Sequence, residues 1–148
     1  MEIGYLIAIL ITATGLLAGY LIGLTVPKEI KQSKKYLILL QSALFTIIIG
    51  LIIYEYKTTF HFIWVGAVLM LVYYLFNEKL NSNTYWLIGT YAFYGILAYV
   101  SYDYFLPLAG TQFIYGLTTG SLNLKKWKIL IPSGIIYILI AGLLILLI

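Results

Sequence analysis

The chain has 148 residues, of which 63% are hydrophobic and only 9% are charged, and its mean hydropathy is +1.01. Soluble domains carry about 25% charged residues, so this composition excludes a water-soluble globular surface. All nine basic residues are lysine, the net charge is +4, and the absence of cysteine excludes disulfides, thiolate metal sites and cysteine catalysis.

Six apolar segments follow one another along the chain, and each is close to the length that a helix needs to cross a bilayer. They lie at residues 4–25, 36–54, 60–76, 85–102, 104–122 and 129–148. The polar stretches between them are too short for a folded domain outside the membrane. The sequence therefore predicts a single membrane domain of residues 1–148, which is an all-α polytopic protein built as a compact bundle of six transmembrane helices.

The first apolar segment lacks a basic start and a small-residue cleavage site, so we interpret it as a retained span and not as a signal peptide. It carries glycine at every fourth position, at Gly15, Gly19 and Gly23, and Gly116 and Gly120 repeat this spacing in the fifth span. Small residues let helices approach closely in a bilayer. The spacing predicts a close helix contact, made either with another helix of this chain or with a partner.

The fifth span, residues 104–122, is the least apolar of the six. On a membrane-insertion scale, leucine, isoleucine and phenylalanine favour insertion of this span. Their summed free energy barely offsets the unfavourable free energy of Gln112, Pro107 and the glycines. We expect it to cross the membrane only when neighbouring helices cover it. The alternative is a re-entrant segment, which would place the lysine-bearing connections on opposite faces of the membrane.

Polar side chains inside the spans are the candidate binding residues, because polar groups at membrane depth are costly and often functional. The fifth span has a narrow polar face, the second span has a glutamine toward its cytoplasmic end, and the fourth span carries a stripe of tyrosines. For each of them, a hydrogen bond between helices or an interfacial position is the structural alternative to a ligand site. The candidate ligand-binding residues are Gln41, Gln112, Thr119, Tyr91, Tyr94 and Tyr99.

The charged residues predict the orientation in the membrane. All lysines except Lys57 follow the first, third or fifth span, so the positive-inside rule places these connections in the cytoplasm and both termini outside. The lysines there would meet anionic lipid, and no nucleic-acid partner is needed to explain them. The outer rim gathers Glu55, His61 and Asp103, which could attract a cation, although charges at this depth are usually only solvated.

Several kinds of chemistry are excluded by missing residues. One histidine without cysteine cannot supply a bis-histidine haem, an iron–sulfur cluster or a typical zinc site. The chain also has no arginine, no Walker loop and no acidic pair at membrane depth. We therefore expect no enzymatic activity, no cofactor and no bound metal. The abundance of isoleucine, tyrosine and lysine points to a prokaryotic plasma membrane protein.

Two function classes remain. The first is a small integral membrane transporter or channel for a small polar solute or ion, with a midplane site on the second, fourth and fifth spans. The second is a non-enzymatic accessory or assembly subunit of a larger membrane protein complex. It would dock through small-residue helix faces, either as a homo-oligomer or with another membrane protein.

Overall fold

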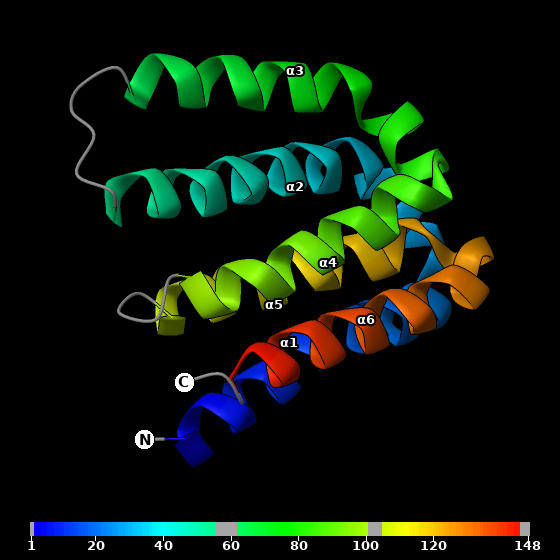
Figure 1. Cartoon of the computed structure of the whole chain (residues 1–148). Coiled ribbons are helices and arrows are strands. Elements are labelled where there is room, and N and C mark those ends of the chain that lie inside the picture. The colour runs from blue at the N-terminus through cyan, green and yellow to red at the C-terminus, as the bar shows by residue number, and fades with distance from the viewer. Residues whose placement is uncertain (1, 56–61, 101–104, 146–148) are drawn as a thin grey trace.

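A computed structural model of the chain describes residues 2–55, 62–100 and 105–145, and it confirms the all-α, six-helix fold (Figure 1). Most helices are joined by very short turns, and a 3₁₀ turn precedes the last helix. The elements are α1 (Glu2–Thr25), α2 (Pro27–Glu55), α3 (Phe62–Ser82), α4 (Thr84–Val100), α5 (Phe105–Leu122), η2 (Leu124–Lys126) and α6 (Trp127–Ile145).

Two stretches that were expected to be connections are helical. The lysine-rich residues 26–35 are almost entirely part of α2, and residues 77–82 continue α3. The backbone N–H of Val26 donates to the carbonyl of Ile22 at 3.0 Å, and that of Ile30 donates to the carbonyl of Val26 at 3.1 Å. Helical hydrogen bonding is therefore nearly continuous from α1 to α2. Lysine, glutamate and glutamine are good helix formers, so a helix can continue where its apolar span has ended.

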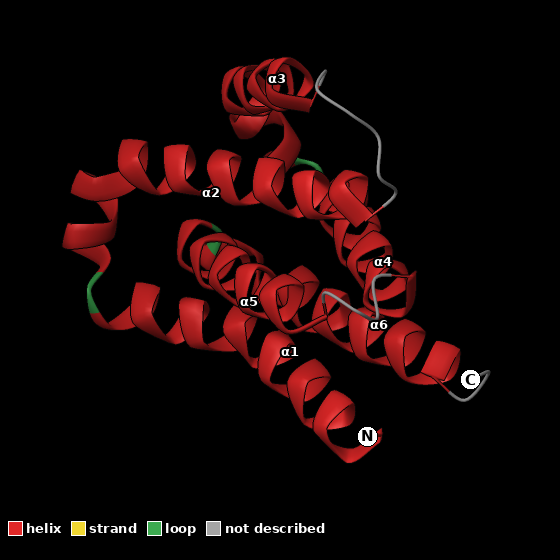
Figure 2. Ribbon diagram, turned by 90° about the vertical axis from the view of Figure 1, so that its left-hand side faces the viewer, coloured by secondary structure: helices red, strands yellow, loops and turns green. Residues whose placement is uncertain are grey.

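The helices run back and forth between two ends of the bundle (Figure 1). The turns α1–α2, α3–α4 and α5–α6 gather at one end, while α1 begins and α6 ends at the opposite end. Helix α5 lies in the middle and packs against α1, α2 and α4, whereas α4 packs on α6 and α3 lies outside on α2 (Figure 2). Helix α5, whose span was expected to be the least apolar, is therefore surrounded by helices of the same chain.

Three helical stretches in the described residues are long and apolar enough to cross a membrane, not six. They are Tyr5–Thr25, Pro27–Leu51 and Leu124–Leu144, and α3 adds the shorter apolar stretch Val68–Asn77. Helix α4 is too short to count, because it has only 17 residues. Helix α5 has polar residues along one face, which lower the mean hydropathy of α5. The three long apolar helices suggest a membrane protein.

The outside of the bundle is more apolar than the surface of a soluble protein. Large aliphatic side chains are exposed there, and the core contains neutral polar side chains among the hydrophobic ones. A monomeric soluble protein rarely exposes apolar surface so continuously, but lipid is a suitable solvent for it. Exposed examples on α1, α3 and α6 are Leu10, Ile11, Leu17, Leu21, Val68, Leu71, Leu75, Leu139 and Leu143.

The glycines of α1 lie where α1 meets α5 and the turn after it. A Cβ atom added at Gly15 or Gly19 would overlap the backbone carbonyl of Phe113 or Leu117, and one added at Gly23 would overlap the side chain of Leu124. The contact is therefore made within one chain.

Helix α5 presents Gly116 and Gly120 to α1 at the same contact. A Cβ atom at Gly116 would lie 2.9 Å from the backbone nitrogen of Leu16, and one at Gly120 would overlap the carbonyl of Leu16. The hydroxyl of Thr12 also donates to the carbonyl of Ala109 across the contact at 3.3 Å. Glycine on both helices lets the two backbones touch, so the pair packs more closely than larger residues would allow.

We expect Gly120→Ala to lower the free energy of unfolding by about 1–3 kcal/mol, because the added methyl group must push the two backbones apart. Gly110→Ala is the matched control on the same helix, since a Cβ atom there meets nothing within 4 Å. Unfolding in mixed micelles with increasing denaturing detergent, followed by circular dichroism, measures both. Equal stability of the two variants would show that the α1–α5 contact is looser than described.

Candidate functional site

A cluster of polar and aromatic side chains occupies the middle of the bundle, and five helices contribute to it. All of its members are buried, and none of them is charged. We call it the buried polar cluster. Its residues are Gln41 of α2, Tyr73 and Asn77 of α3, Tyr91 and Tyr94 of α4, Gln112, Tyr115 and Thr119 of α5, and Tyr137 of α6.

Helix α5 supplies three members because of their spacing. Gln112, Tyr115 and Thr119 are separated by three and four residues, so they lie on one face of the helix. The glycines at 116 and 120 turn another face toward α1. The same helix thus carries a smooth face for packing and a polar face for the cluster.

A chain of hydrogen bonds connects α3, α2 and α5. The amide of Asn77 donates to Gln41 Oε1 at 3.0 Å, and Gln41 Nε2 donates to Thr119 Oγ1 at 2.8 Å. The Thr119 hydroxyl then donates to the backbone carbonyl of Tyr115 at 2.8 Å. Gln41 is completely buried, so its side chain lies in the core of the bundle and not on its surface.

Tyrosine rings fill the space beside this chain. The hydroxyls of Tyr73 and Tyr115 share a hydrogen bond of 2.5 Å. Phe45 stacks on Tyr73 with ring centroids 4.6 Å apart, and Tyr94 meets Tyr115 edge to face at 5.2 Å. Such aromatic pairs add about 0.5–1.5 kcal/mol beyond the area they bury, so the rings are held firmly in place.

Three buried polar groups in this region have no hydrogen-bond partner among the described residues. They are the hydroxyls of Tyr91 and Tyr94 and the indole N–H of Trp86. The Tyr91 hydroxyl faces Thr119, the Tyr94 hydroxyl faces Tyr115 and the Trp86 indole N–H faces Tyr73, but none of these contacts has hydrogen-bond geometry. An unsatisfied buried donor costs about 1–3 kcal/mol, and several unsatisfied groups close together mark a place where a polar ligand would gain hydrogen bonds.

Among the described residues, Gln112 has only long hydrogen bonds. The Tyr137 hydroxyl donates to its Oε1 at 3.3 Å, and its Nε2 donates to the Tyr94 carbonyl at 3.5 Å. Both distances exceed the usual range of such bonds. The amide of Gln112 is therefore a further group that can exchange a weak internal partner for a ligand.

The structure brings together five of the six residues predicted to bind a ligand, namely Gln41, Gln112, Thr119, Tyr91 and Tyr94. The side chain of the sixth, Tyr99, lies outside the described residues, as do His61, Asp103 and the side chain of Glu55.

Sequence reasoning missed several members of the buried polar cluster and the neighbouring residue Trp86. Asn77 was placed in a connection, because the third span was expected to end at residue 76. The spacing of four residues between Tyr73 and Asn77 is the signal that could have assigned both to one helix face. The other residues that were not singled out are Trp86, Tyr115 and Tyr137.

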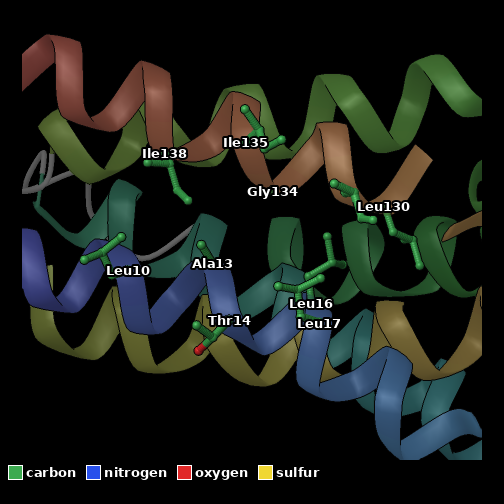
Figure 3. Close-up of a pocket in the computed structure, with 10 residues that line it drawn as sticks. Leu10, Ala13, Thr14, Leu16, Leu17, Leu130, Gly134, Ile135 and Ile138 are labelled. Atoms are coloured by element: carbon green, nitrogen blue, oxygen red, sulfur yellow. The ribbon is translucent and has the colours of Figure 1, made fainter. Parts of the chain in front are cut away.

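A crevice of about 170 Å³ lies between α1 and α6 and has a different character (Figure 3). Leucine and isoleucine side chains line most of it, and Thr14 is the only polar side chain among its described lining residues. The Thr14 hydroxyl already donates to the Ile11 carbonyl at 2.6 Å. The crevice therefore offers space to an apolar chain and no recognition to a polar solute.

Comparison with known proteins gives no relative from which to infer the chemistry of the cluster. No protein-family model matches the sequence, and neither the curated proteins nor the solved structures include a significant match. The arrangement itself offers neutral donors and acceptors on firmly packed rings. This suits the binding of a small polar molecule better than proton transfer or nucleophilic attack.

We expect Gln41→Leu to lower the free energy of unfolding by about 1–3 kcal/mol, because the change leaves Asn77 and Thr119 without their shared partner. Gln32→Leu on the exposed part of the same helix is the control and should change the stability by less than about 0.5 kcal/mol. Denaturation in mixed micelles measures both. A fully stable Gln41→Leu variant would contradict a structural role for the hydrogen-bonded chain.

Proposed function

We propose that the protein is a small integral membrane transporter or channel, in which a small polar solute or ion binds at the buried polar cluster. The observation that carries this proposal is the group of unsatisfied donors at Tyr91, Tyr94 and Trp86. Burying such groups without a partner lowers stability. A ligand that accepts their hydrogen bonds during its passage gives a physical reason for the arrangement.

We also propose that all six helices lie in the membrane, with the lysine-bearing turns in the cytoplasm and both termini outside. The arrangement of the bundle supports this, since the three lysine-bearing turns share one end (Figure 1). Helix α5 is enclosed by α1, α2 and α4, so it needs little apolar surface of its own (Figure 2). Lysine-rich turns at one end match the charge bias of cytoplasmic loops.

Single cysteines test this topology cleanly, because the natural chain has none. In intact cells, an impermeant thiol reagent should label Thr58→Cys, which lies between the second and third helices. It should label Ser33→Cys and Ser82→Cys only after the membrane is opened, since both lie at the lysine-bearing end. The reverse labelling pattern would refute the orientation, and labelling of all three in intact cells would refute the six-span arrangement.

Tyr94→Phe separates a binding role from a packing role. The lost hydroxyl has no partner, so the free energy of unfolding should stay within about 1 kcal/mol of the natural value or rise. Permeation should nevertheless fall by about tenfold, the factor expected for one lost hydrogen bond of about 1.4 kcal/mol. Proteoliposomes given osmotic gradients of glycerol, urea and potassium chloride provide the measurement.

Tyr85→Phe is the matched control for this experiment, because Tyr85 lies on the same helix and is exposed. It should leave both stability and permeation unchanged. If no probe crosses faster than in empty liposomes, or if Tyr94→Phe behaves as the natural protein does, the cluster is not a permeation site for these solutes.

The alternative function, an accessory or assembly subunit, has weaker support. It was expected to dock through small-residue helix faces, among them the face of α1. Gly15 and Gly19 instead face α5 of the same chain. A partner would have to dock on another surface, so we retain the transporter or channel as the proposal.

A further inference from the structure

A cavity of about 390 Å³ opens at the lysine-bearing end of the bundle, between the start of α2 and the turn that joins α5 to α6. The two walls come from residues almost a hundred positions apart in the sequence. The lining residues are Pro27, Ile30, Lys31 and Lys34 on one side and Ser121, Leu122, Asn123, Leu124, Lys125 and Lys126 on the other.

The lining of the cavity is positively charged. Four lysines from two parts of the chain line it, and its described lining residues include no carboxylate. A negatively charged group seated between the two walls would be attracted by lysines from both of them.

The walls of the cavity also carry neutral polar and apolar side chains. Ser121 and Asn123 are buried polar residues, and Ile30, Leu122 and Leu124 add apolar surface beside them. A bare inorganic ion would use only the charged part. A ligand that has both a negative group and an apolar body would use the whole cavity.

The depth of the cavity matches that of lipid headgroups. The expected apolar spans end at residue 25 and begin again at 36, and they end at residue 122 and begin again at 129. The lining residues, at 27–34 and 121–126, fall almost entirely between these spans. Trp127, which is half exposed, follows directly. Tryptophan is enriched at the boundary between lipid and water, which is where lipid phosphates lie.

We propose that this cavity binds the phosphate group of an anionic phospholipid, with the lysines holding the phosphate and the apolar wall contacting the glycerol and upper acyl chain. The shared chemistry is recognition of a phosphate-type anion, and a lipid is the source that fits the position and the mixed lining. The inference requires the membrane setting but does not depend on solute transport.

The test compares two double variants that remove the same net charge. Lys125→Gln with Lys126→Gln removes both positive charges from one wall of the cavity. Lys28→Gln with Lys128→Gln removes two nearby lysines that do not line it. Native mass spectrometry of each protein in neutral detergent, titrated with dioctanoyl phosphatidylglycerol, gives the affinity. Dioctanoyl phosphatidylcholine and inorganic phosphate are titrated in parallel.

We expect one phosphatidylglycerol molecule to bind the natural protein. The first double variant should weaken binding about 30-fold, at about fivefold per lysine charge. The second double variant should weaken binding by no more than about threefold. Charges outside the cavity act on the lipid through water, where dissolved salt screens them.

Three results would overturn the proposal. Equal losses in the two double variants would indicate diffuse attraction without a built site. Equal affinity for phosphatidylcholine would show that the negative headgroup is not recognised. Binding of inorganic phosphate without binding of phosphatidylglycerol would make the ligand a soluble anion. Thermal unfolding of both variants shows that a lost affinity does not come from a lost fold.

Discussion

The close contact between α1 and α5 is the constraint on which the rest of the bundle depends. Glycine on both helices lets their backbones touch, which fixes the rotation of α5 about its own axis. With Gly116 and Gly120 turned toward α1, the face carrying Gln112, Tyr115 and Thr119 points toward α2 and α4. The packing face of one helix thereby positions the polar face of the same helix.

This division of faces also explains what the sequence could and could not predict. Glycine spacing and hydropathy predicted close helix packing and an all-α bundle, because both depend on residues within one helix. The choice between packing inside the chain and docking with a partner depends on the fold, and Gly15 and Gly19 gave no sign of it. Asn77 was missed because the third apolar span was expected to end at residue 76, and its hydrogen bond to Gln41 joins two different helices.

The interior combines satisfied and unsatisfied polar groups, and the two kinds have different consequences. The chain from Asn77 through Gln41 to Thr119 is satisfied and locks three helices together. The hydroxyls of Tyr91 and Tyr94 lie beside it without partners. Because firmly packed rings cannot easily turn to find partners, the cost of the unsatisfied groups persists. This contrast singles out α4 as the helix on which a ligand would act.

The same two helices connect the proposed solute site with the proposed lipid site. Gln41 and Thr119 join α2 to α5 in the core, and the amide of Asn123 donates to the Thr119 carbonyl at 3.0 Å one turn nearer the lysine-bearing end. The cavity at that end again lies between α2 and the end of α5. A phosphate held between its two walls would brace the helix pair whose spacing sets the position of Gln41 against Thr119. Lipid bound at the surface would thus favour the same arrangement of α2 and α5 that the buried hydrogen bonds favour, without any direct contact between the two sites.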